Sequence, residues 1–120
     1  LSMRVMQGLE HGKVYDLSRL FRDRKRLITI GREDSNVVCI PESESPYISR
    51  RHCTIETDVR TGRWFIRDGQ WIAEKGRIGY WKESVNGTYI NSTPVTPEGS
   101  ELHPGDIITI GDVTFRIEDY

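Results

Sequence analysis

Apolar and polar residues alternate with a period of two along most of this chain. The alternation is clearest at residues 27–30, 53–56, 108–110 and 113–117. It is typical of β-strands that bury one face and expose the other. Shorter runs of the same kind predict further strands at residues 4–6, 13–17, 37–40, 64–66 and 88–90.

Glycine and proline separate these runs and predict tight turns between strands. Gly111-Asp112 lies between two alternating runs and predicts a two-residue hairpin. Only residues 17–27 carry a helical pattern, and their arginine-rich middle favours a solvated loop or hairpin. Parallel sheets need crossover helices, for which the chain has no room, so we expect a mostly antiparallel sandwich or barrel.

The length and charge of the chain limit the classes of function. The 120 residues fit one domain over 1–120, with a core from about 4 to 118, and Leu1-Ser2-Met3 also suits one module of a longer protein. There are 17 Lys and Arg against 18 Asp and Glu. This balance argues against nucleic-acid binding. That function stays an alternative only for a basic run interrupted by Asp23: Arg19, Arg22, Arg24, Lys25 and Arg26.

The two cysteines, Cys39 and Cys53, lie inside apolar runs. We expect both to be buried, unpaired and in a reducing compartment, which predicts a cytoplasmic, intracellular protein. No apolar stretch approaches the roughly 20 residues that span a bilayer, so we expect no membrane contact. The histidines and cysteines lack paired ligand spacing, and no phosphate-cradling loop is present, so we expect no metal and no cofactor.

A first candidate for binding chemistry is Gly31-Arg32, which follows an apolar strand. Arginine presents a planar fork that can donate two hydrogen bonds to one phosphate group. The alternative is a surface ion pair between Arg32 and Glu33 or Asp34.

A second candidate is Ser49-Arg50-Arg51-His52, on a loop that leads into a strand. Ser49 offers a hydroxyl, and the two arginines add positive potential. His52 could be a general base for Ser49, but no acidic partner and no nucleophile-elbow glycines accompany it. We therefore expect His52 to brace a neighbouring loop, and we expect no enzyme.

A third candidate is Asn86-Gly87-Thr88, followed by Asn91. Asn-Gly is a common hairpin signal because both residues tolerate positive φ. The side-chain amide of Asn86 can also donate and accept, so it can pair with the main chain of a peptide.

These motifs, in this order and with Leu102-His103-Pro104-Gly105-Asp106 behind them, resemble the forkhead-associated (FHA) domain. The resemblance covers nearly the whole chain. It implies a SMAD/FHA-like sandwich of about eleven mostly antiparallel strands, with binding loops at one end. It also implies a phosphothreonine-peptide-binding module of Ser/Thr-kinase signalling, which we expect to be monomeric as an isolated domain.

The resemblance also implies roles for individual residues. Arg32, Ser49 and Arg50 would contact the phosphate, and Asn86 would hold the peptide main chain. Tyr47 lies where the family often reads the third residue after the phosphothreonine. The expected scaffold of the site consists of Gly31, His52, Gly87, Thr88 and Asn91.

Two features depart from the family pattern. The residue before the asparagine is often serine or threonine, whereas here it is Val85, with Ser84 one step earlier. Either one phosphate contact is missing, or Ser84 replaces it. Segment 70–83 is longer than the usual connection and partly apolar. It is either a hairpin packed on its own sheet or an extra wall of the peptide groove. As an alternative function, this FHA fold would bind a partner independently of phosphorylation, through the surface from Trp71 to Trp81.

Overall fold

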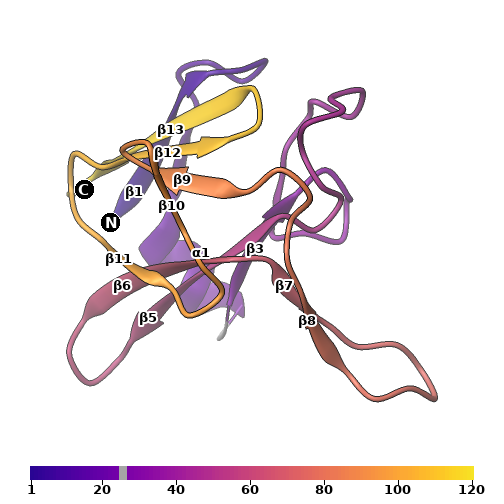
Figure 1. Cartoon of the computed structure of the whole chain (residues 1–120). Coiled ribbons are helices and arrows are strands. Elements are labelled where there is room, and N and C mark those ends of the chain that lie inside the picture. Colours follow the sequence, from indigo (N-terminus) through magenta and orange to yellow (C-terminus); the bar gives the residue numbers. More distant parts are fainter. Residues whose placement is uncertain (25–26) are drawn as a thin grey trace.

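The computed structural model describes residues 1–24 and 27–120, which fold into a sandwich of two sheets (Figure 1). The first sheet contains β1 (Ser2–Gln7), β2 (Val14–Asp16), β9 (Thr88–Ile90), β10 (Thr93–Pro94), β12 (Ile107–Ile110) and β13 (Val113–Glu118). The second contains β3 (Ile28–Gly31), β4 (Val38–Cys39), β5 (Cys53–Asp58), β6 (Arg63–Asp68) and β11 (Ser100–Leu102). The predicted all-β sandwich is confirmed.

The strand order is β10-β9-β12-β13-β1-β2 in the first sheet and β11-β6-β5-β3-β4 in the second. A separate hairpin, β7 (Gln70–Ile72) and β8 (Tyr80–Lys82), forms a two-stranded sheet of its own and projects from the sandwich (Figure 1). The described part therefore has thirteen strands instead of about eleven. None of the alternating runs in the sequence includes β10 or β11, which have two and three residues.

The alternating runs supply the core between the two sheets. Ile28 and Ile30 of β3 are fully buried, while Thr29 between them is less buried. Phe115 and Ile117 of β13, in the opposite sheet, are also buried in this core. Burying one such side chain contributes roughly 1.5–3 kcal/mol, so the strand pattern is also the main source of stability. As predicted, β12 and β13 are joined by a two-residue turn, with Ile110 paired to Val113.

Residues 17–24 form a helix, α1 (Leu17–Arg24), so the expected loop or hairpin is wrong there. The carboxylate of Asp16 accepts the backbone N–H of Arg19 at 3.1 Å and so caps the helix. Leu17 is fully buried, and the ring of Phe21 meets that of Trp64 edge to face at 5.9 Å. This apolar face docks the helix although its outer face is arginine-rich. Lys25 and Arg26 of the basic run lie outside the described residues.

The two cysteines have different environments. Cys53 is buried as expected, but Cys39 is exposed, and both thiols are free. On β4 the alternation directs Val38 into the core and Cys39 outward. β4 pairs with β3 in parallel over only two residues and without a crossover helix. Among the described residues, no helix is long and apolar enough to cross a membrane.

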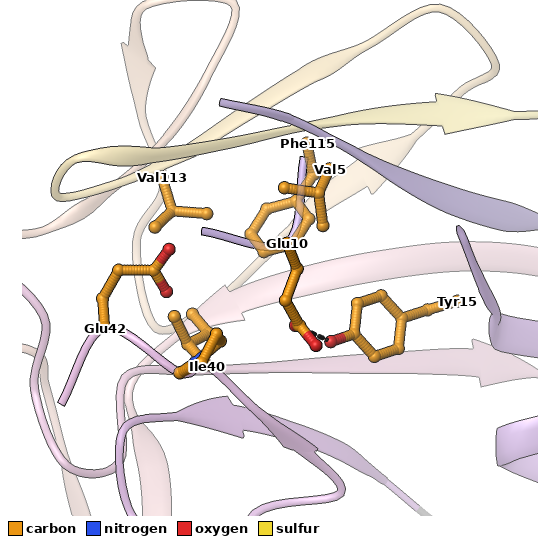
Figure 2. Close-up of a pocket in the computed structure, with 8 residues that line it drawn as sticks. Val5, Glu10, Tyr15, Ile40, Glu42, Val113 and Phe115 are labelled. Carbon is orange, nitrogen blue, oxygen red and sulfur yellow. Dashed lines mark hydrogen bonds between the residues drawn. The ribbon is translucent and has the colours of Figure 1, made fainter. Parts of the chain in front are cut away.

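A small cavity lies between β1, β13 and the segment after β4 (Figure 2). Its volume is about 10 Å³, enough for about one water molecule. The hydroxyl of Tyr15 donates to the carboxylate of Glu10 beside it. This cavity is too small to hold a ligand, so the functional site has to be sought at the loops.

Candidate functional site

The loops after β3, before β5 and before β9 meet at the end of the sandwich opposite the two termini (Figure 1). The backbone N–H of Arg32 donates to the carbonyl of Ser49 at 3.3 Å, and that of Val85 donates to the Ser49 hydroxyl at 3.0 Å. A pocket of about 450 Å³ opens here, lined by Arg32, Ser49, Arg50, Val85 and residues of the β7–β8 hairpin. Two motifs that are distant in the sequence, Gly31-Arg32 and Ser49-Arg50-Arg51-His52, thus contribute residues to one pocket, beside the loop that carries the third motif.

Gly31 permits the close approach of two of these loops. A β-carbon at this position would collide with the carbonyl oxygen of Arg50 and lie 2.9 Å from the side-chain nitrogen of Asn36. Gly31 is itself the last residue of β3. It is needed because the next loop packs directly on its backbone.

The guanidinium of Arg32 is held by the loop before β5. Its Nε donates to the carbonyl of Ile48, and its Nη1 donates to the carbonyl of Ser43 at 3.2 Å. An arginine has five N–H donors, so three remain for a ligand. In the described part of the chain Arg32 forms no ion pair with Glu33 or Asp34, and the carboxylate of Glu33 lies 3.6 Å from Arg51 instead.

Ser49 and His52 form a bridge between two loops. Nδ1 of His52 accepts the backbone N–H of Ser49 at 3.0 Å, and Nε2 lies 2.8 Å from the carbonyl oxygen of Gly87. Since Nδ1 accepts, the ring proton must be on Nε2, and the imidazole is neutral. The Ser49 hydroxyl accepts from Val85, and its own proton is free to donate into the pocket.

Burial lowers the pKa of His52, and the hydrogen bond with the Gly87 carbonyl opposes this shift only in part. A second proton on the ring would remove the acceptor that Ser49 uses. The imidazole therefore connects the loop before β5 with the loop before β9, and both of its nitrogens form hydrogen bonds with backbone groups.

The buried carboxylate of Asp68 forms hydrogen bonds with the loop before β9. Its Oδ1 accepts from the hydroxyl of Ser84 at 2.6 Å and from that of Thr88 at 2.8 Å. Its Oδ2 accepts the backbone N–H of Ser84 at 3.2 Å. Asp68, at the end of β6, was not identified from the sequence. A carboxylate at the end of a strand usually faces solvent, and only the tertiary structure buries this one.

These contacts decide between the two possibilities for Ser84. Its hydroxyl donates to Asp68 and accepts the backbone N–H of Gly87 at 2.9 Å, so it faces the interior of the loop. We therefore assign Ser84 to the frame of the loop and not to phosphate contact. Val85 lines the pocket with an exposed side chain that offers no hydrogen bond.

Asn86 lies on the other side of the same loop. One N–H of its amide donates to the carbonyl of Tyr47 at 3.2 Å, which leaves a second N–H and the Oδ1 oxygen. Asn86 and Tyr47 line a second cleft of about 340 Å³ together with Tyr89, Thr109, Gly111 and Asp112. The structure thus brings Tyr47 beside Asn86 in a largely apolar cleft next to the first pocket.

Asn91 does not support the Asn86 loop as expected. Its Nδ2 donates to Asp106 at 2.9 Å, and its Oδ1 accepts the backbone N–H of Ile107 at 2.9 Å. These contacts fix the turn before β12, at the far end of β9. The expected grouping with Thr88 fails because Thr88 is the first residue of β9, whereas Asn91 follows its last residue.

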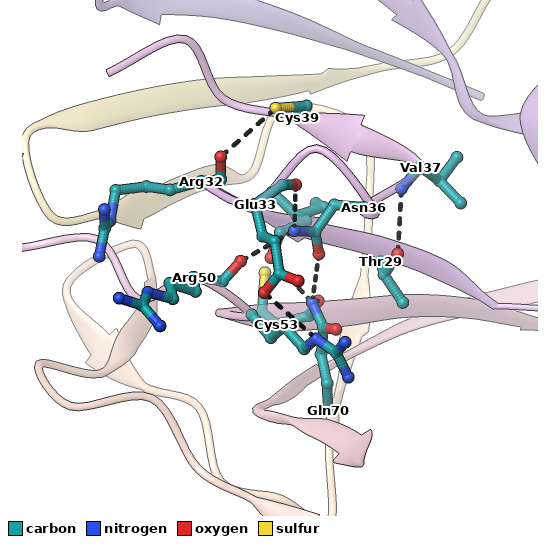
Figure 3. A network of polar contacts seen from close by, with 11 residues as sticks. Thr29, Arg32, Glu33, Asn36, Val37, Cys39, Arg50, Cys53 and Gln70 are labelled. Carbon is teal, nitrogen blue, oxygen red and sulfur yellow. Dashed lines mark hydrogen bonds and ion pairs between the residues drawn. The ribbon is translucent and has the colours of Figure 1, made fainter. Parts of the chain in front are cut away.

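A buried amide pair underlies the loops after β3 and before β5 (Figure 3). Nδ2 of Asn36 donates to the carbonyls of Glu33 at 2.7 Å and Arg50 at 2.8 Å. Its Oδ1 accepts from Nε2 of Gln70 at 2.8 Å. Nothing in the sequence singled out Asn36 or Gln70, because isolated amides in turns and strands are common. Their burial shows that they fix the pocket floor.

In the described part of the chain, no three His, Cys, Asp or Glu side chains form a group that could hold a metal ion. The pocket instead offers N–H and O–H donors on a rigid frame. Such a set suits an anionic ligand with several acceptor oxygens.

Comparison with known proteins gives a consistent match. The profile of the FHA domain family matches residues 28–111. The ABC transporter ATP-binding/permease protein Rv1747 of Mycobacterium tuberculosis is 32% identical over 92 residues, which cover 77% of this chain and 8% of that protein. This chain therefore spans less than a tenth of that relative.

Two solved structures share the fold. One, from a structural and functional analysis of phosphothreonine-dependent FHA domain interactions, aligns with a TM-score of 0.68 at 24% identity and covers 99% of this chain and 95% of that one. The other is the FhaA FHA domain complexed with the intracellular domain of Rv3910. It aligns with a TM-score of 0.65 at 24% identity and covers 96% of each chain.

Proposed function

The chain belongs to the family of FHA domains, and on this premise we propose that it binds phosphothreonine-containing peptides at the pocket between its loops. One observation carries the proposal: Arg32, Ser49 and Arg50 line the same pocket, and each has unused donors or positive charge. A phosphothreonine brings a charge of about −1.5 to −2 and several strong acceptor oxygens near neutral pH.

The contacts available predict a moderate affinity. A charge-assisted hydrogen bond contributes roughly 1.5–3 kcal/mol, and two or three of them must offset the ordering of a flexible peptide. This balance corresponds to a Kd near 1 μM, about −8 kcal/mol. The amide of Asn86 holds the peptide main chain, and the cleft beside Tyr47 receives the third residue after the phosphothreonine.

Phosphothreonine is preferred over phosphoserine for two reasons. Burial of the extra methyl group contributes about 0.8 kcal/mol, a few-fold effect. The β-branched side chain is also stiffer and presents its phosphate already oriented. Matched phosphothreonine and phosphoserine peptides of equal affinity would contradict this selectivity.

The test is capture of peptides from a degenerate library with a fixed phosphothreonine, using the wild type, Arg32→Ala and Arg32→Lys. We expect Arg32→Ala to lose nearly all capture and Arg32→Lys to lose most of it, because lysine keeps the charge without the fork. Arg60→Ala is the matched control, since Arg60 lies on the turn between β5 and β6. Equal capture of phosphorylated and unphosphorylated libraries would refute the proposal.

A second candidate function has its own observation. Trp71 is 56% exposed and Ile78 is 93% exposed on the β7–β8 hairpin, away from the sandwich. Phosphorylation-independent binding of a partner through this surface would be lost in Trp71→Ala. It would also persist in the presence of excess phosphothreonine peptide, which separates the two functions.

A further inference from the structure

The β7–β8 hairpin has two chemically different faces. Ile72 pairs with Tyr80 across the hairpin, and both line the phosphate pocket together with Lys82. Trp71 pairs with Trp81 and lies on the opposite face, because successive residues of a strand point to opposite sides. The face with Ile72, Tyr80 and Lys82, here called the inner face, therefore forms a wall of the pocket.

This wall is fixed to the sandwich at its base. Nε1 of Trp81 donates to the carbonyl of Asp68 at 2.8 Å, and the guanidinium of Arg67 lies over the Trp81 ring at 4.1 Å. Gln70, at the start of β7, is buried in the amide pair with Asn36. The inner face is thus held in a defined position relative to the hydrogen-bond donors that would contact the phosphate.

The charges on this wall largely compensate one another. Lys82, Glu74 and Glu83 all line the pocket, and the carboxylate of Glu74 lies 3.8 Å from Arg77. The wall therefore has no strong preference for a charged residue. Ile72 is only 7% exposed, so the accessible apolar surface here comes from Tyr80, which is 47% exposed, and from Val85 of the neighbouring loop, which is 84% exposed. The valine that offers no hydrogen bond to a phosphate instead extends this apolar surface.

The loop before β9 divides the site into two parts. Val85 lines the phosphate pocket and the hairpin wall, whereas its neighbour Asn86 lines the cleft beside Tyr47. A peptide that crosses this loop has residues on both sides of it. Under the proposed function, the cleft beside Tyr47 receives residues that follow the phosphothreonine. The inner face then meets the residues that precede it.

We propose that the inner face and Val85 form a second specificity subsite, which binds an apolar side chain within the three residues preceding the phosphothreonine. This inference rests on the proposed function and extends it. The subsite is continuous with the phosphate pocket, so one bound peptide can occupy both. Partial burial of one aliphatic or aromatic side chain corresponds to a preference of about fivefold over alanine.

The test uses phosphothreonine peptide libraries in which one of the three preceding positions is fixed in turn as each amino acid. We expect the wild type to prefer Leu, Ile, Phe or Tyr over Ala by about fivefold at one of these positions. Tyr80→Ala combined with Val85→Ala should reduce this preference below about twofold, measured as the ratio between the apolar-fixed and alanine-fixed libraries captured by the same variant, so that a general loss of affinity cancels. Trp71→Ala, on the opposite face of the hairpin, should keep the preference.

Three results would overturn the inference. The first is a wild type that binds phosphothreonine peptides in an Arg32-dependent way without an apolar preference, which leaves the proposed function intact. The second is a preference that survives in the double variant, or a preference for acidic or basic residues. The third is a wild type that captures no phosphothreonine peptide, in which case the proposed function fails as well. Thermal unfolding of each variant checks that it is folded.

Discussion

The buried carboxylate of Asp68 gives the sharpest prediction about the frame of the site. It accepts from the Ser84 hydroxyl, the Ser84 backbone N–H and the Thr88 hydroxyl, and Thr88 is fully buried. In Asp68→Ala, the Thr88 hydroxyl and the Ser84 N–H would lose their acceptor. A buried donor without a partner costs about 1–3 kcal/mol, and the Ser84 N–H is only partly buried, so the two donors together cost at most about 6 kcal/mol.

Removal of the carboxylate also has a favourable part. Asp68 is only 5% exposed, and burial of a carboxylate has an unfavourable desolvation free energy. This unfavourable contribution is absent from the alanine variant. We therefore expect the free energy of unfolding to fall by about 2–4 kcal/mol. Phosphopeptide affinity should fall at least about tenfold, because the loop with Val85 and Asn86 is no longer preorganised.

A double-mutant cycle with Thr88→Val separates the hydrogen bond from general damage. In the wild type this substitution should cost about 1–2 kcal/mol, because it removes one donor to Asp68. In the Asp68→Ala background it should cost nothing or stabilise, because it removes the hydroxyl that lost its acceptor. Urea unfolding gives the stability of each variant, and titration with a phosphothreonine peptide captured by the wild type gives the affinity.

The matched control is Glu56→Ala. The carboxylate of Glu56 lies 3.7 Å from Arg67 in a partly exposed ion pair, so its removal should change stability by less than about 1 kcal/mol. If Asp68→Ala unfolds within 1 kcal/mol of the wild type and binds peptide as tightly, Asp68 does not hold the loop, and the reasoning fails.

Three further predictions address other parts of the structure. Gly31→Ala should lower stability by about 1–3 kcal/mol and abolish phosphopeptide binding, because the new methyl group displaces the loop with Ser49; wild-type affinity would contradict this. Burial lowers the pKa of His52 below 6.5, so the free energy of unfolding should be constant above pH 6.5 as far as His52 is concerned and should decrease as the pH falls below 6.5. Urea unfolding at several pH values below 6.5 should show this decrease for the wild type and not for His52→Gln. A thiol reagent should modify Cys39 in the native protein and Cys53 only after unfolding, because burial raises the pKa of the Cys53 thiol; two fast-reacting thiols would contradict the structure.

Controls exist for the first two of these predictions. Gly12 has a φ of 90° and no other atoms near the position of a β-carbon, so Gly12→Ala should strain the backbone without affecting phosphopeptide binding. His103 is exposed, and His103→Ala should keep the loss of stability below pH 6.5. A His52→Gln variant with an unchanged pH dependence would mean that another group titrates in this window.

Much of the fold could be predicted because strand patterns are local. The runs that became β3, β5, β12 and β13 alternate clearly, since one sheet face is buried and the other is not. The helix α1 was missed because its outer face is rich in arginine, while its packing depends on contact between Phe21 and Trp64, which are distant in the sequence. The exposure of Cys39 was missed because a two-residue edge strand gives almost no alternation to interpret.

The residues of the candidate site also divide into those that could be identified from the sequence and those that could not. Arg32, Ser49, Arg50 and Asn86 were identified because their chemistry is visible in short motifs that end or begin strands. The polar residues beneath them could not be identified. Asn36, Asp68 and Gln70 resemble ordinary turn or strand residues until folding buries them.

The sequence by itself determined the strand pattern, the residue types of the candidate site and the resemblance to FHA domains, because each of these depends on residues that are close together in the chain. Only the tertiary structure decided which donors are already engaged, that Ser84 faces the interior, and that Asn91 supports a different turn. It also decided which face of the hairpin lines the pocket. These features depend on hydrogen bonds and packing between distant segments, whose geometry exists only when the two sheets have closed on each other.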